Sequence, residues 1–221
     1  MDILSTVLLD DEETTYLTDL LTKDESLWLD GRLTAGEFAA EVKKNKQLNP
    51  SSRSSQIATE FVSSKLRESP LIKSFTLVRR VHSILFSRSN SGDGYGWHVD
   101  NPFSKQGRRD LSFTLFLSPP SSYGGGELEI QKTQGSVDYK LPAGEILLYP
   151  STALHSVREV TSGSRLVCVG WIESYVSSHE DRVLLFNLDA GAKGLLARHG
   201  RSPELDLIYQ AYANAVRRLA G

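Results

Sequence analysis

The sequence predicts a mainly β domain with helices at both ends. Between residues 76 and 176, short β-rich runs alternate with clusters of Gly, Pro and Ser, as in strands joined by tight turns. On either side of this zone, apolar residues recur at helical spacing. Many short strands with turn signals are typical of a closed or double-sheet barrel. A chain of 221 residues with 39% hydrophobic content can bury such a core.

The first part of the chain, residues 1–75, is expected to be mostly helical. Asp10 or Asp11 can cap a helix that carries acidic residues in its first turn. A second helix is expected to begin near Ser54 and to stop before Pro70, because proline disrupts a helix interior.

The predicted core, residues 76–176, is expected to supply the strands of the barrel. The candidate strands are 77–87, 110–118, 126–132, 136–141, 145–149 and 164–172. The last of them is almost wholly apolar, which is typical of a strand buried on both faces.

The end of the chain, residues 177–221, reads as a helical extension. Ser202 as N-cap and Pro203 at the first helical position begin an amphipathic stretch. We therefore expect one domain over residues 1–176, followed by this extension.

Composition narrows the classes of function. The 25 Lys and Arg nearly balance the 27 Asp and Glu, so neither nucleic acid nor an anionic membrane is expected as a partner. The single cysteine, Cys168, allows no internal disulfide and reads as a small buried hydrophobe. The start of the sequence lacks the features of an export signal, and no apolar run is long enough to span a membrane, so a cytoplasmic location is expected.

The most informative pattern is His98-Val99-Asp100, followed far downstream by His155 and then by Arg165. Two imidazoles and one carboxylate form the facial ligand set of non-haem Fe(II) oxygenases, which leaves open positions on the metal. His-x-Asp by itself is a weak signal, since aspartate is common. The strand context of Arg165 strengthens it.

Arg165 begins the apolar run that ends at Ile172, and alternation puts its side chain on the same face as Val167, Val169 and Trp171. A guanidinium in an apolar interior needs an anionic partner. That partner is either a structural Asp or Glu or the carboxylate of a ligand. A planar guanidinium suits the carboxylate of a 2-oxo acid, so the pattern favours an iron(II)/2-oxoglutarate oxygenase.

Several neighbouring features have plainer interpretations. The glycine-rich stretch from Ser89 to Trp97 lacks the lysine and helix of a phosphate loop, and we interpret it as a mobile cover. His82 is expected to be a hydrogen-bonded core histidine. Trp97 fits a pocket wall and the core equally well. Arg108-Arg109 could steer an anionic substrate, although a solvated loop is the favoured interpretation.

The chain also resembles the PKHD-type hydroxylases, bacterial relatives of prolyl 4-hydroxylase in the iron(II)/2-oxoglutarate oxygenase superfamily. The resemblance extends over most of the sequence. Its stretches are Trp28, Asp30-Gly31-Arg32, Thr34-Ala35-Gly36, Val42-Lys43, Gln47-Leu48, His98-Val99-Asp100-Asn101, Asp110-Leu111-Ser112, Thr114-Leu115-Phe116-Leu117-Ser118, Tyr123, Gly125-Gly126-Glu127-Leu128, Leu141-Pro142-Ala143-Gly144, Leu148-Tyr149-Pro150-Ser151-Thr152, Leu154-His155 and Trp171-Ile172.

The resemblance implies a double-stranded β-helix (jelly-roll) core. It implies iron on His98, Asp100 and His155, and 2-oxoglutarate on Arg165. It also implies ascorbate as the reductant that keeps the iron ferrous.

One departure from the family pattern concerns the co-substrate. Where the family carries Asn-Arg-Tyr on the strand before His-x-Asp, this sequence has Ser87-Arg88-Ser89. If the missing tyrosine hydroxyl contacts 2-oxoglutarate, another group must replace it. Tyr95 and Tyr149 are the candidates.

The expected activity is oxidation of a C–H bond in a primary substrate, coupled to conversion of 2-oxoglutarate and O2 into succinate and CO2. The substrate class stays open between a prolyl or other residue of a peptide and a small molecule such as a siderophore. The alternatives are a jelly-roll metal-binding or sensor protein without turnover, and a cupin-like metalloprotein.

Overall fold

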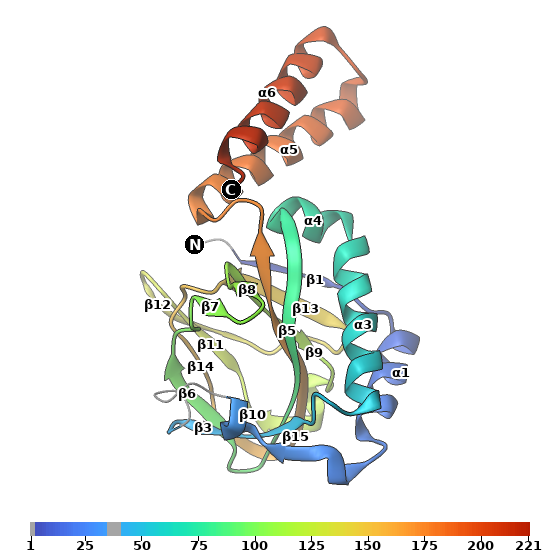
Figure 1. Cartoon of the computed structure of the whole chain (residues 1–221), viewed down its shortest axis with the longest axis vertical. Coiled ribbons are helices and arrows are strands. Elements are labelled where there is room, and N and C mark those ends of the chain that lie inside the picture. The colour runs from blue at the N-terminus through green and yellow to red at the C-terminus, as the bar shows by residue number, and fades with distance from the viewer. Residues whose placement is uncertain (1–2, 35–40) are drawn as a thin grey trace.

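The computed structural model describes residues 3–34 and 41–221, and within them two antiparallel sheets face each other (Figure 1). The larger sheet has the order β1 (Leu4–Val7), β13 (Glu145–Pro150), β9 (Leu111–Phe116), β15 (Val160–Ser174), β5 (Val78–Asn90), β4 (Lys46–Leu48) and β2 (Trp28–Asp30), and β10 (Tyr123–Gly125) pairs with β15. The smaller sheet has the order β12 (Gly135–Tyr139), β11 (Leu128–Lys132), β14 (His155–Val157), β6 (Gly94–His98) and β3 (Lys43–Lys44). This arrangement confirms the predicted jelly-roll.

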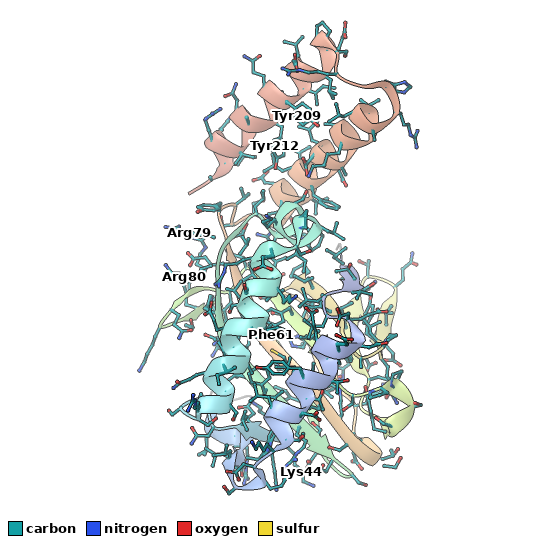
Figure 2. All side chains as sticks on the ribbon, turned by 90° about the vertical axis from the view of Figure 1, so that its right-hand side faces the viewer. Lys44, Phe61, Arg79, Arg80, Tyr209 and Tyr212 are labelled. Carbon is teal, nitrogen blue, oxygen red and sulfur yellow. The ribbon has the colours of Figure 1, made fainter. Side chains whose placement is uncertain are left out.

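Three helices cover the outer face of the larger sheet: α1 (Asp11–Thr22), α3 (Arg53–Glu68) and α4 (Pro70–Thr76) (Figure 1). A capping box at Asp10 begins α1, since its side chain accepts from the Glu13 amide and the Glu13 side chain accepts from the Asp10 amide. Figure 2 shows Phe61 between α3 and α1, where its ring meets Tyr16 edge-on at 5.7 Å. The outer core is therefore built from helix and sheet side chains together.

Short elements complete the path of the chain. They are the 3-10 turns η1 (Glu25–Leu27), η2 (Gly31–Thr34) and η3 (Pro120–Ser122), and the hairpin of β7 (Phe103–Ser104) with β8 (Gly107–Arg108).

The helices α5 (His179–His199) and α6 (Pro203–Leu219) form a hairpin that stands at one end of the barrel (Figure 1). Ser202 caps α6 and Pro203 opens it, as predicted. In Figure 2, Tyr209 and Tyr212 lie on α6, in the hairpin that stands clear of the sheets. At the base of the hairpin, Arg182 donates to the Val176 carbonyl at 2.8 Å.

The expectation of a mostly helical N-terminal part is wrong in one respect. Within the described residues, this part also supplies four strands. β1 and β2 form the two edges of the larger sheet, β4 lies next to β2, and β3 forms an edge of the smaller sheet. These strands are two to four residues long, too short for an alternating pattern to reveal them. Ala35 and Gly36, which belong to the family resemblance, lie outside the described residues.

The stretch from Ser89 to Trp97 is not a loose cover. β5 runs to Asn90, β6 starts at Gly94, and the turn between them is held by the bonds Gly92 N–Val160 O at 2.8 Å and Asp93 N–Asn90 O at 2.9 Å. Gly92 adopts a φ of 84° in the turn. Gly94 and Gly96 lie in β6, where a Cβ would meet Val157 O at 3.1 Å and Val42 Cβ at 2.8 Å, respectively, so the glycines are explained by the turn and by close packing. No helix within the described residues is long and apolar enough to cross a membrane.

In the larger sheet, the Phe113 ring lies close to the backbone of Gly170, and this contact gives a stability prediction. A Cβ at Gly170 would lie 2.7 Å from Phe113 Cζ, so Gly170→Ala should destabilise the fold by about 1–3 kcal/mol through overpacking. A Cβ at Gly194, within α5, would meet nothing within 4 Å, so Gly194→Ala should stabilise by about 0.4–1 kcal/mol. Thermal denaturation of both variants measures this; equal shifts would contradict the packing argument.

Candidate active site

A cavity of about 550 Å³ lies between the two sheets, and it is large enough for two small ligands together. The inward side chains of β15, Arg165, Val167, Val169 and Trp171, line one wall, as alternation predicts. His98, Asp100 and His155 line the same cavity. The structure therefore brings together the residues that the sequence pattern singled out.

The two histidines meet because β14 pairs with β6 in a register that sets His155 opposite His98. Their ring centroids are 4.2 Å apart at an angle of 52°. Nδ1 of His98 lies 2.8 Å from the Gly96 carbonyl, and Nδ1 of His155 lies 2.9 Å from the Ala153 carbonyl. A carbonyl accepts, so each Nδ1 carries the proton and each Nε2 lone pair is free for a metal.

Asp100 follows β6 and is held by hydrogen bonds to one of its oxygens. Oδ2 accepts from Ser112 Oγ at 2.5 Å and from Trp171 Nε1 at 3.0 Å. Ser112 Oγ lies 2.8 Å from Ser151 Oγ, which extends the chain of contacts. Within the described residues these bonds leave Oδ1 as the available ligand atom, and the three ligand atoms lie within 4.8 Å of one another.

The protonation state of His98 suits metal binding. Burial, together with the neighbouring His155, lowers its pKa to about 4. His98 is therefore neutral near pH 7, so a proton does not compete with a metal for Nε2.

Arg165 is buried, with 3% of its surface exposed, and it forms no ion pair with any acidic side chain of the described residues. Its Nε is buried without a hydrogen-bond partner, and the Phe116 ring lies 5.6 Å from its guanidinium. Burial lowers the Arg165 pKa, and the Tyr123 and Tyr149 hydroxyls oppose that shift most. The charge of Glu127, which forms its ion pair with Lys140, makes a smaller contribution against the same shift. Of the two partners that the sequence left open, the geometry therefore favours a ligand carboxylate.

Each candidate replacement tyrosine packs on one of the paired histidines. Tyr149 is buried against His155, with ring centroids 5.3 Å apart, and the charges of Asp100 and Arg165 both act on its hydroxyl. Tyr95 stacks on His98 at 3.7 Å, and burial raises its pKa to about 12. Of the two, Tyr149 is therefore the candidate on which Arg165 acts. Ser89, at the family's tyrosine position, pairs directly with Arg165 across β5 and β15.

Tyr123 is a residue that the search for a replacement tyrosine missed. Its hydroxyl is buried, which raises its pKa, and it makes no hydrogen bond of good geometry with a described residue, but it lies near enough to Arg165 for that side chain to oppose the rise. A Cβ at Gly126 would lie 3.0 Å from Arg165 Cδ and 3.1 Å from Tyr123 Cε2, so this glycine makes room for both side chains. The family stretch Tyr123 with Gly125-Gly126 was the available signal.

Two cations complete the lining of the cavity. Arg109, expected on a solvated loop, is half-buried instead, with its guanidinium 4.0 Å from the Trp171 ring centroid. Lys43, for which the sequence gave no functional signal, is 7% exposed, and burial lowers its pKa to about 8. Lys43 belongs to the two-residue strand β3, and Arg109 directly follows the two-residue strand β8, so sequence periodicity does not reveal their contacts.

The remaining expectations have mixed outcomes. His82 is confirmed as a core histidine, since its Nε2 lies 2.8 Å from the Arg108 carbonyl. Trp97 is neither core nor cavity wall, because 44% of its surface is exposed and it does not line the cavity. Alternation along β6 turns it outward from its neighbour His98.

Comparison with known proteins agrees with this geometry. The sequence profile of the 2OG-Fe(II) oxygenase superfamily matches residues 84–173. The structure is similar to a prolyl-4-hydroxylase of Pseudomonas putida, with a TM-score of 0.56, 18% identity and coverage of 78% of this chain and 92% of that one. It is also similar to a Trichoplax adhaerens prolyl hydroxylase in complex with a hypoxia inducible factor peptide, with a TM-score of 0.57, 15% identity and coverage of 82% and 86%. At these identities the likeness shows the fold.

Curated relatives match the whole chain. A PKHD-type hydroxylase of Synechococcus sp. (strain CC9902) is 69% identical over 221 residues, 100% of both chains. Another, of Prochlorococcus marinus (strain MIT 9303), is 57% identical over 219 residues, 99% of both chains. On this full-length identity, the chain belongs to the PKHD-type hydroxylase family, and it is an iron(II)- and 2-oxoglutarate-dependent oxygenase.

Proposed function

We propose that His98, Asp100 and His155 bind the iron and that Arg165 binds the distal carboxylate of 2-oxoglutarate. The observation that carries this proposal is the convergence of three ligand atoms within 4.8 Å on the cavity that Arg165 also lines. The donor set of two imidazoles and one carboxylate suits Fe(II) and leaves positions for co-substrate and O2. Bound iron and 2-oxoglutarate supply the oxidation, with succinate and CO2 released.

The protein's own contribution is placement and exclusion of water. Ser112 and Trp171 hold Asp100, and the backbone carbonyls at Gly96 and Ala153 hold the two histidines. The apolar side chains Val167, Val169 and Phe113 line the cavity around them. The co-substrate reaches a site whose groups are already oriented.

Arg165 also separates this proposal from the alternatives considered above. A metal-binding or sensor protein without turnover, or a cupin-like metalloprotein, has no use for a buried guanidinium that lacks a carboxylate partner. A 2-oxo acid supplies that partner. We further propose residues 1–176 as the oxygenase unit and residues 177–221 as an appended hairpin.

Other expectations stay predictions. Ascorbate as reductant follows from the family resemblance, and the cytoplasmic location follows from the sequence. The primary substrate, peptide or small molecule, is taken up below.

Removing the carboxylate tests the metal assignment. Asp100→Ala should lose most Fe(II) affinity in an anaerobic titration and should stop succinate formation, because one of three ligands is gone. The fold should persist in circular dichroism, because hydrogen bonding within both sheets does not depend on the metal.

Asp19→Ala is the matched control, since Asp19 is exposed on α1. Asp189 would serve poorly, because it is buried and accepts from Ser74 Oγ at 2.5 Å. Equal Fe(II) affinity in Asp100→Ala and the parent protein would rule out the assignment.

A charge-conserving change tests the co-substrate assignment. Arg165→Lys loses the planar fork, and losing one charged hydrogen bond of about 1.5–3 kcal/mol weakens 2-oxoglutarate binding roughly 10- to 150-fold. Fe(II) binding should change little. An anaerobic spectral titration of the Fe(II) protein measures both, with Arg198→Lys on the exposed end of α5 as control. Unchanged 2-oxoglutarate affinity would remove Arg165 from this role.

The replacement tyrosine is tested by a pair of deletions. Because the charge of Arg165 acts on the Tyr149 hydroxyl, Tyr149→Phe should weaken 2-oxoglutarate binding about 2- to 10-fold, the value of one neutral hydrogen bond. Tyr95→Phe should weaken it less. The same titration ranks the two variants, and a larger loss in Tyr95→Phe would reverse the assignment.

A further inference from the structure

Arg109 is a cation in the cavity that the proposed function leaves unused. Its Nε is buried without a hydrogen-bond partner, and within the described residues its guanidinium forms no ion pair. The guanidinium carbon Cζ lies 4.0 Å from the Trp171 ring centroid. Burial lowers the Arg109 pKa, and the charge of Asp100 opposes that shift without a direct ion pair. Because Asp100 is a proposed iron ligand, its charge is shared with the metal, and Arg109 is left without a direct anionic partner among the described residues.

The position of Arg109 is fixed before any ligand arrives. Its amide donates to the Pro102 carbonyl at 2.9 Å. Its neighbour Arg108 is tied to Asp110 at 3.3 Å. Trp171, on which Arg109 stacks, donates to Asp100. Arg109 is therefore held one side chain away from a proposed iron ligand, whereas the charge of Arg165 acts on Tyr123 and Tyr149.

The net charge of the cavity also favours an anionic ligand for Arg109. Among its described lining residues, the cations are Lys43, Arg109 and Arg165, and Asp100 is the one carboxylate. When both histidines are counted as neutral, as metal ligands must be, the lining carries a formal charge of +2. Iron(II) adds two positive charges and 2-oxoglutarate brings two negative ones, so the excess persists. Leaving Lys43 out of the count still leaves the cavity positive. A neutral primary substrate would not relieve this excess.

We propose that the primary substrate carries a carboxylate, which Arg109 binds beside the C–H bond to be oxidised. The planar guanidinium can donate two parallel hydrogen bonds to a carboxylate. The carboxylate is a handle for binding and is not altered. A free amino or hydroxy acid and an acidic or C-terminal residue of a peptide both present this group. The inference rests on the proposed function, since it takes Arg165 and the iron as occupied by 2-oxoglutarate.

Matched acid and amide pairs test the inference. The probes are free L-amino acids against their amides, and acetylated tripeptides with a C-terminal carboxylate against the same tripeptides with a carboxamide. Two readouts are taken: succinate formed above the rate without primary substrate, and calorimetric binding to protein loaded with Mn(II) and 2-oxoglutarate. The two series of probes distinguish a small-molecule source from a peptide source.

The expected result is a preference for the acid member of at least one pair by roughly tenfold, the loss expected for one charged hydrogen bond. Arg109→Gln should abolish this preference, and Arg109→Lys should retain part of it. Arg165→Gln should instead raise the 2-oxoglutarate requirement. Arg198→Gln, on the exposed end of α5, is the control for loss of a positive charge.

Three results would overturn the inference. The first is an equal response to acids and amides in both readouts, and the second is an acid preference that survives in Arg109→Gln. The third is a loss of 2-oxoglutarate affinity in Arg109→Gln that is as strong as the loss in Arg165→Gln. The last would assign Arg109 to the co-substrate. Failure of the proposed function is separate, because it appears as no succinate from the parent protein with any probe. The Mn(II) binding comparison then still decides the role of Arg109, and the conservative Arg109→Lys variant guards against misfolding.

Discussion

The register between β14 and β6 is the constraint on which the rest of the site depends. It sets His155 opposite His98, on strands from distant parts of the sequence. Side chains alternate along a strand, so a slip of one residue would turn one imidazole away from the cavity. The hydrogen bonds of both Nδ1 atoms to backbone carbonyls then fix the ring orientations. Backbone pairing therefore determines where a metal can be held.

The larger sheet solves a second problem, how to keep polar groups in an apolar interior. β15 carries Arg165 toward the smaller sheet and Cys168 toward the helices, so one strand serves two different cores. Asp100 gains donors from β9 and β15 through Ser112 and Trp171. Asp100, Arg109 and Arg165 are thus each supported by a strand of the larger sheet, whose far face is packed against α1 and α3.

Sequence patterns predicted much of this and missed parts for identifiable reasons. The long strands, the caps at Asp10 and Ser202, and the grouping of His98 with His155 follow from periodicity, capping chemistry and spacing. The short strands at the sheet edges do not, because two or three residues carry no readable alternation. For Arg109, composition favoured a solvated loop over a role with an anionic substrate. Its half-buried position could not be predicted, because stacking on Trp171 is a contact between side chains far apart in sequence.

The tight turn between β5 and β6 has a consequence for how ligands are selected. Ser89 and Gly94, on either side of this turn, line the cavity, and the backbone hydrogen bonds of Gly92 and Asp93 hold the two strands in place between them. On this side the wall of the cavity is therefore formed before a ligand binds. Molecules are sorted by whether they fit an opening that already exists, and little ordering entropy is lost on entry. Selectivity gained in this way comes without the delay of a closing step.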